Sequence, residues 1–209
     1  MITVSGAAAD RNLLTLAEMK TALAITGSGS NDALTALGLQ ISDMIARECC
    51  VAADGVAPPT LRRETIVETL RLDRRVSPLR LARRFVDSIT SIVEAGVTLN
   101  VADYEVEKAA GLIRRLDASG DIVCWPGEKI VVTYLAGFET VPEPLKLAAI
   151  TVLREQWSAA SRDPNVRAEA VDGIGRTEYW VNSSTGASSS RAMSSVAMAM
   201  LGPYATMVL

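Results

Sequence analysis

The stretch that decides the fold covers residues 130–157 and reads IVVTYLAGFETVPEPLKLAAITVLREQW. Its first part, residues 130–135, is rich in β-branched residues and ends before Gly137, which is typical of a short buried strand. Glu143 and Pro144 then suit a helix start, because proline lacks only an N–H that the first turn does not need. Thr140 with Glu143 fits a capping box and gives an alternative start a few residues earlier. Apolar residues follow at spacings of three and four, so we expect a strand, a glycine turn and an amphipathic helix that share one core.

Two further helices are predicted near the N-terminus. Thr15 and Glu18 form a capping box that opens a short helix, and this helix stops at the glycines of residues 27–29. One of residues 30–32 then caps a second helix, whose apolar stripe runs to about Cys50. We expect the two helices to pair as a hairpin.

Short strands dominate the middle of the chain. Pro58 and Pro59 end the helical pattern. Strand-like segments separated by glycine turns follow at residues 65–72, 86–99, 104–107, 112–116 and 122–125. This spacing predicts an antiparallel meander, not parallel βαβ units.

The C-terminal region reads as an arm. Residues 171–181 fit a hairpin or an extended segment, residues 183–195 are rich in serine, and residues 193–201 form an apolar helix. That helix either covers the core of its own chain or contacts a partner.

We therefore predict an α+β fold. It comprises a helical core made of the N-terminal helix pair and the central helix, an inserted small antiparallel β-domain, and an extended C-terminal arm that ends in a short helix. The expected boundaries are residues 1–57, 58–138, 139–163 and 164–209 for the N-terminal helices, the β-domain, the central helix and the arm.

Composition excludes several function classes. The chain has 209 residues, a net charge of −3 and no histidine, which rules out Ser-His-Asp and Cys-His catalysis. Cys49, Cys50 and Cys124 lack metal-site spacing, and an odd number of cysteines argues against a disulfide framework. No apolar run is long enough for a membrane span and no secretion signal opens the chain, so we expect a cytoplasmic protein without membrane contact.

No motif predicts an enzyme. Residues 173–175 read as a plain turn, because the third glycine of a dinucleotide loop is missing. Asp103, Glu105 and Glu107 alternate along a strand and could meet a cation, but a solvated strand face explains them more simply. We predict no catalytic residue, no metal and no cofactor, and a small carboxylate-based enzyme is the least favoured alternative.

The ordered motifs resemble the head-tail connector, or adaptor, family of tailed bacteriophages, prophages and gene-transfer agents. Residues 14–18, LTLAE, match the motif that opens its first helix, and residues 125–137, WPGEKIVVTYLAG, match the phrase that closes its β-insert. Val141-Pro142 and residues 145–148, LKLA, follow as in that family. The resemblance covers about residues 14–160.

The resemblance implies a structural protein of the particle neck, assembled in the bacterial cytoplasm. Its subunits would form a ring below the portal, with twelve copies to match the portal. The ring would extend the DNA channel and offer an attachment surface to the next head-completion or tail protein. A tail-completion protein or another non-catalytic binding module of the same assembly is the alternative.

Charge and apolarity then give candidate contact residues. Residues 60–85 hold eight arginines against three acidic residues, a local excess that suits DNA phosphates or an acidic neighbouring subunit. We assign Arg83 and Arg84 to non-specific DNA contact in the channel. We assign six others to the subunit interface: Arg62, Arg63, Arg71, Arg74, Arg75 and Arg80. The apolar residues of the last helix are assigned to contact with the portal or a neighbour: Val196, Met198, Met200, Leu201 and Tyr204.

Overall fold

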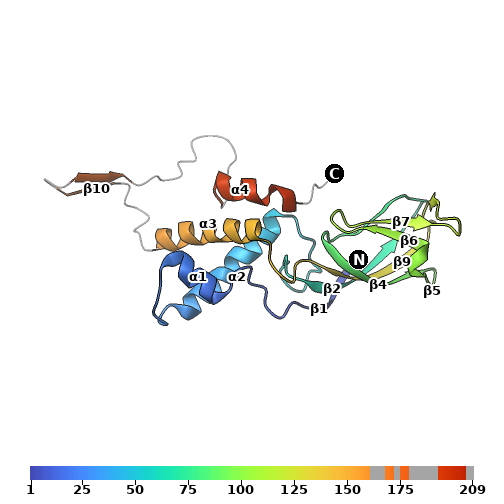
Figure 1. Ribbon diagram of the computed structural model, residues 1–209, viewed down its shortest axis with the longest axis horizontal. Coiled ribbons are helices and arrows are strands. Elements are labelled where there is room, and N and C mark those ends of the chain that lie inside the picture. The colour runs from blue at the N-terminus through green and yellow to red at the C-terminus, as the bar shows by residue number, and fades with distance from the viewer. Residues whose placement is uncertain (161–167, 172–174, 179–192, 206–209) are drawn as a thin grey trace.

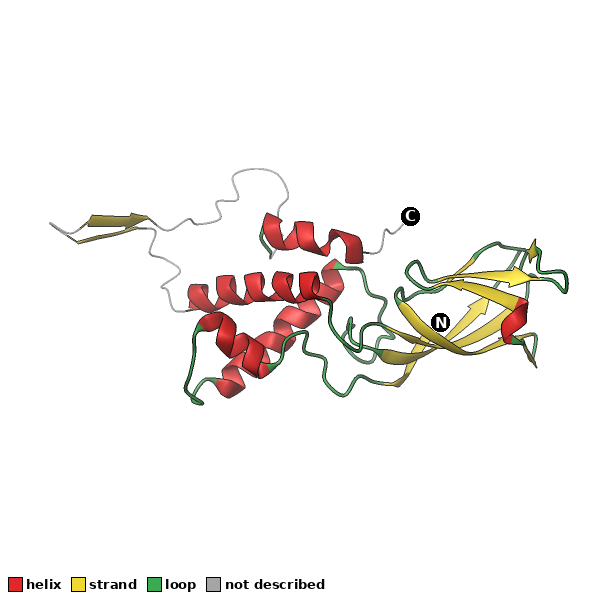
Figure 2. Cartoon of the chain, in the orientation of Figure 1, coloured by secondary structure: helices red, strands yellow, loops and turns green. Residues whose placement is uncertain are grey.

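A helical body and a β body lie end to end along the long axis of the molecule (Figure 1). The computed structural model describes residues 1–160, 168–171, 175–178 and 193–205. The fold is α+β, as the sequence predicts. Figure 2 shows the helices gathered at one end and the large sheets at the other.

Local signals position the helices where the sequence analysis expects them. The helical body contains α1 (Leu16–Leu23), α2 (Asn31–Glu48), α3 (Glu143–Ala160) and α4 (Ser195–Leu201), which the 3₁₀ turn η2 (Gly202–Tyr204) follows. The capping box of α1 forms as predicted: Thr15 Oγ1 accepts a hydrogen bond from the Glu18 N–H, and the Glu18 carboxylate accepts one from the Thr15 N–H. Helix α3 begins at Glu143, which agrees with the predicted start at Glu143 and Pro144 and not with the alternative start at Thr140.

The four helices enclose one hydrophobic cluster. It includes Met19 of α1, Ile45 of α2 and Val152 of α3, all at most 1% exposed. Ala197 and Leu201 of α4 complete it at 0% and 1% exposure. The terminal helix therefore covers the core of its own chain, which decides between the two alternatives stated for it.

The β body consists of two antiparallel sheets. The first has the order β1 (Ile2–Gly6), β2 (Glu64–Arg71), β9 (Lys129–Ala136), β4 (Val86–Glu94) and β5 (Val97–Thr98). The second has the order β3 (Leu79–Arg80), β7 (Leu112–Leu116) and β6 (Tyr104–Glu107), and β8 (Ile122–Val123) also pairs with β7. A 3₁₀ turn, η1 (Val101–Asp103), leads into β6.

These strands enclose a second hydrophobic cluster. Alternate residues of β9, namely Ile130, Val132 and Tyr134, are 0% exposed, and Trp125 is equally buried. The indole N–H of Trp125 donates to the Ile113 carbonyl at 3.0 Å, so its polar group is satisfied inside the β body.

The expectation that β9 and α3 share one core is wrong. The side chains of β9 belong to the β cluster, whereas those of α3 belong to the helical cluster. Gly137 redirects the chain between them, with a φ of +97°. A β-carbon at this position would lie 2.5 Å from the Arg62 carbonyl oxygen, so only glycine lets the two segments approach this closely.

The strands differ from the sequence prediction in two further ways. Residues 2–6, for which the sequence predicts no strand, form the edge strand β1 and pair with β2. The first sheet is also not a meander, because β9 lies between β2 and β4. Both differences concern pairings between strands distant in sequence, which local alternation does not specify.

The described part of the arm contains one hairpin. Strands β10 (Ala168–Val171) and β11 (Gly175–Glu178) pair antiparallel, beginning slightly before the predicted residues 171–181. The serine-rich prediction falls mostly on residues 183–192, outside the described residues.

Candidate interaction surfaces

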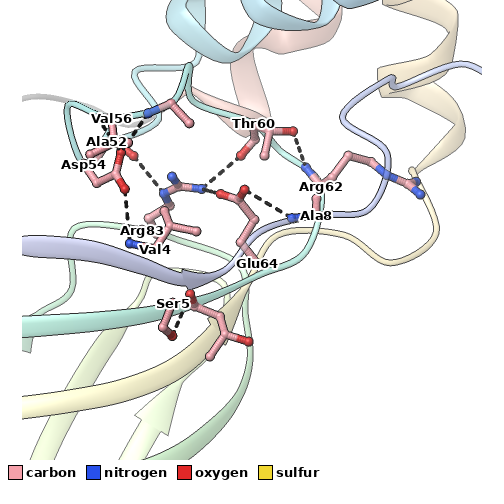
Figure 3. Close-up of polar contacts among 12 residues, drawn as sticks. Val4, Ser5, Ala8, Ala52, Asp54, Val56, Thr60, Arg62, Glu64 and Arg83 are labelled. Atoms are coloured by element: carbon pink, nitrogen blue, oxygen red, sulfur yellow. Dashed lines mark hydrogen bonds and ion pairs between the residues drawn. The ribbon is translucent and has the colours of Figure 1, made fainter.

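Arg83 lies inside the molecule, at the junction of the helical and β bodies (Figure 3). Its Nη1 is 2.8 Å from Glu64 Oε2, and both side chains are only 5% exposed. The guanidinium also donates to the carbonyls of Thr60 at 3.2 Å and Ala52 at 2.8 Å. The prediction that Arg83 contacts DNA is therefore wrong, because its side chain is buried and its charge is paired with Glu64 within the chain.

The same junction holds the N-terminal segment. Glu64 Oε1 accepts a hydrogen bond from the Ala8 N–H at 3.4 Å, and Asp54 Oδ2 accepts one from the Val4 N–H at 3.3 Å. Hydrogen bonds from the Val56 and Ala57 N–H groups lower the pKa of Asp54, which favours its charged form. The junction therefore fixes β1 and the loop after α2 to the start of β2.

A second buried carboxylate supports the loop that carries Arg83. Tyr134 Oη donates to Glu68 Oε2 at 2.8 Å, and the Ala82 N–H donates to the same oxygen at 2.9 Å. The Arg83 N–H in turn donates to Tyr134 Oη at 3.3 Å. Burial, followed by the Glu68 charge, raises the pKa of Tyr134, so the phenol keeps the proton that it donates.

Arg84 binds the C-terminal segment. Its Nη1 donates to the Ala205 carbonyl at 2.6 Å, and its guanidinium carbon lies 5.0 Å from the centre of the Phe85 ring. Phe85, Phe138 and Tyr204 form an aromatic trio with centroid distances of 4.9, 5.8 and 5.9 Å. Arg84 thus makes contacts within the chain while staying only partly buried, and its contact with DNA stays a prediction.

The predicted contact residues of the last helix separate into two faces. Leu201 is 1% exposed and serves the chain's own packing, which corrects its assignment to a partner, whereas Tyr204 joins the aromatic trio but stays half-buried, so its partner contact remains a prediction. Val196 is 56% exposed, and Met198 and Met200 are half-buried against the helical cluster. Val196 thus remains the most accessible of the five.

The six arginines assigned to the subunit interface also separate. Arg63 forms ion pairs with Asp87 at 3.3 Å and Glu139 at 2.8 Å, and Arg62 Nε donates to the Asp10 carbonyl at 3.3 Å. These two are held within the chain. The other four are exposed: Arg71, Arg74, Arg75 and Arg80.

Three of the exposed arginines gather with a lysine at one end of the first sheet. Arg71 lies opposite Lys129 in the β2–β9 register, and the loop with Arg74 and Arg75 continues directly from β2. We call Arg71, Arg74, Arg75 and Lys129 the basic tip. Like charges directly opposite each other on a sheet repel, so the Arg71–Lys129 pair favours an anionic neighbour.

The described residues contain neither a candidate metal site nor a membrane-spanning helix. No group of three or more His, Cys, Asp or Glu side chains there could hold a metal ion. None of the helices described is long and apolar enough to cross a membrane. Burial raises the pKa of the Cys49 thiol to about 12, which keeps it in the unreactive protonated form.

Solved structures with a similar fold include chains of gene-transfer-agent (GTA) particles. A chain in the neck of an empty GTA particle, computed with C6 symmetry, matches with a TM-score of 0.59 and 16% identity. The match covers 100% of this chain and 97% of that chain. The chain has the fold of a gene-transfer-agent neck protein.

Two further structures share this GTA neck fold. A chain in the virion of a native gene-transfer-agent particle matches with a TM-score of 0.57 and 17% identity, and one in the neck of a native GTA particle computed with C12 symmetry matches with 0.56 and 16%. Each covers 100% of this chain and 97% of its own length. No family profile and no curated protein matches the sequence. The likeness supports the head-tail connector resemblance at the level of the fold.

Proposed function

We propose that the protein is a head-tail connector subunit, located in the neck of a gene-transfer agent or phage-like particle. The supporting observation is the fold match over the whole chain, with a TM-score of 0.59 to a GTA neck chain. The match extends over both bodies, so it does not rest on a common small β-barrel or helix bundle alone.

The proposed assembly is a ring of twelve copies below the portal. Two of the similar structures are GTA necks computed with C6 and C12 symmetry, which suits such a ring. The portal protein and the next head-completion or tail protein are its proposed partners, and packaged DNA passes through its channel.

In this role the protein is non-catalytic. Its contribution is shape and surface: Arg83, paired with Glu64, also binds the Ala52 carbonyl of the segment after α2, which ties that segment to the β body, and the exposed residues form contacts. The basic tip supplies the subunit interface that the sequence analysis assigned to the arginine-rich segment. Arg71, Arg74 and Arg75 carry that proposal, because they are exposed, whereas Arg62 and Arg63 are engaged within the chain.

Purified particles provide the direct test. We expect quantitative mass spectrometry to find the protein at twelve copies per particle, and cryo-electron microscopy to place its density as a ring next to the portal. Absence from purified particles, or isolated copies away from the portal vertex, would refute the proposal.

A further inference from the structure

A groove of about 770 Å³ lies between α1, α3 and α4. Its apolar lining comprises Ala17, Ala22, Pro144, Leu147, Ile150 and Met200. Leu147 is 49% exposed, whereas the other leucines of α3, Leu145 and Leu153, are 0% exposed. The volume lies within the range of about 300–1,000 Å³ that is typical of binding pockets.

The groove lies along the outer edge of the helical cluster: Ile150 and Met200 pack partly against that cluster, whereas Leu147 does not belong to it. On α3, Leu145 and Val152 point into the helical cluster, whereas Leu147 and Ile150 line the groove. On α4, Ala197 is buried, whereas Val196 precedes Met200 by one turn and is 56% exposed. Both helices therefore present a second apolar face next to the groove.

Charged residues give the groove two different ends. Lys146 Nζ bridges Glu18 at 2.8 Å and Glu143 at 3.2 Å, so two carboxylates share one ammonium group and this end keeps an acidic excess. These bonds raise the pKa of Lys146. Arg154 lies at the other end, exposed, with its Nε on the Ala22 carbonyl at 3.0 Å. Arg154 follows Glu143 by eleven positions on α3, a rise of about 16 Å or three helical turns.

A second copy of this chain has no spare helix for the groove among its described residues. Helices α1, α2, α3 and α4 all bury apolar residues in the helical cluster of their own chain. Because each described helix commits its main apolar face to its own chain, the groove suits an amphipathic helix of a different protein better than a helix of a second copy. Such helices lie in apolar grooves through side chains spaced three and four residues apart.

We propose that the groove receives a three-turn amphipathic helix from a different protein of the neck. The helix carries a basic residue at the Glu143 end and an acidic residue at the Arg154 end. This inference rests on the proposed function, because it requires the protein to be assembled in a neck.

Site-specific cross-linking in assembled particles tests the proposal. A benzophenone amino acid replaces Leu147, and the same amino acid replaces Leu39 of α2, a leucine that is 39% exposed on a helix away from the groove, as a control. After irradiation, we expect position 147 alone to cross-link to a helical segment of another neck protein with the stated charge pattern. Cross-links from position 147 to a second copy of this chain, or none at all, would overturn the proposal.

A second variant tests the energetic contribution of the groove. Leu147→Asp leaves the helical core in place, so its unfolding midpoint should stay close to that of Leu39→Asp. The measured quantity is the amount of the partner protein, identified by the cross-link, that stays bound in purified particles. We expect Leu147→Asp alone to lower this amount by about tenfold or more, as for a central interface residue. Equal retention in both variants would refute the groove as a binding site.

The two proposals can fail separately. If the protein is present as a ring in particles but position 147 fails to cross-link, only the groove inference is wrong. If the protein is absent from purified particles, the proposed function is wrong as well.

Discussion

The buried Arg83–Glu64 pair is the residue-scale feature with the largest expected effect on stability. Arg83→Met leaves the Glu64 carboxylate at 5% exposure without its cation, and breaking a buried pair in this way costs roughly 3–5 kcal/mol. Urea denaturation should show this loss of unfolding free energy. Arg75→Met, at an exposed arginine, serves as the control and should change stability by less than about 0.5 kcal/mol. Equal effects of the two substitutions would contradict the structural role of Arg83.

The Tyr134 hydroxyl gives a second residue-scale prediction. Tyr134→Phe removes the donor to Glu68 and the acceptor of the Arg83 N–H while keeping the ring in the β cluster. Glu68 keeps the Ala82 N–H as a donor, but the buried Arg83 N–H loses its acceptor, so the substitution should cost roughly 1–3 kcal/mol. Denaturation of Tyr134→Phe measures this cost, and a variant as stable as the wild type would show that water replaces the hydroxyl.

Arg83 and Glu64 stand out in the sequence, but their roles as a buried ion pair do not follow from it. Arg83 and Glu64 both appear in the charge count of the arginine-rich segment, yet their pairing depends on a loop that returns to the start of β2. A charge count places every arginine on the surface, because it has no information on burial. One signal in the sequence points to burial: Glu64 and Glu68 stand beside the apolar residues of the predicted strand at residues 65–72. The same pattern also fits a solvent-exposed strand face, so it does not predict a buried ion pair.

At the scale of elements, the contact between α1 and α3 depends on pH. Burial raises the pKa of Glu18, but hydrogen bonds from Lys146 and Thr15 outweigh it and hold the pKa below its usual value of 4.5. Because folding lowers the pKa of Glu18, its ionised carboxylate stabilises the protein at pH values above the usual pKa of 4.5. This stabilisation is lost as the pH falls through the pKa of the folded state. Glu18→Gln keeps the capping box, because glutamine also serves at that position, but removes the charge.

We therefore expect Glu18→Gln to lower stability at pH 7 by about 0.2–1 kcal/mol, as for a partly exposed ion pair. The difference from the wild type should shrink as the pH falls below 4.5. Thermal unfolding of both proteins across this range measures it. A difference that stays constant with pH would exclude the ion pair as its cause.

The two faces of α4 give the other prediction at this scale. Leu201→Ala opens a cavity in the helical cluster and should cost roughly 2–5 kcal/mol. Val196→Ala removes a side chain that is 56% exposed and should change stability by less than about 0.5 kcal/mol. Urea denaturation of the two variants compares the faces directly, and similar costs would show that α4 does not pack as described.

Elements with strong local signals were predictable, and elements fixed by distant partners were not. The capping box at Thr15 and the proline at position 144 mark helix starts through contacts within a few residues. The edge strand β1 and the central position of β9 depend on pairing across about sixty residues of sequence. The inward face of α4 depends likewise on α3, which a stripe of apolar residues cannot specify alone.

At the scale of the whole molecule, two separate clusters make the chain an elongated subunit with different surfaces at its two ends (Figure 1). The groove lies on the helical body and the basic tip lies on the β body. Such a subunit can contact different neighbours through each body, which is what a connector between two assemblies requires. The motif resemblance predicts such a role, and burial in the structure tells which of the predicted contact residues are accessible.

The basic tip gives the last prediction, in which stability and assembly change in opposite directions. Arg71→Glu replaces the repulsive pair with Lys129 by an attractive one, so the free subunit should become more stable by about 0.2–1 kcal/mol. The same change removes a positive charge from the proposed interface, so ring formation should weaken, most strongly at low salt, where exposed charges are least screened. Thermal unfolding of the free subunit and sedimentation of assembled rings measure the two effects. Arg47→Glu, at an exposed arginine on α2, is the assembly control. If Arg71→Glu rings form as well as Arg47→Glu rings at every salt concentration, the basic tip does not belong to the subunit interface.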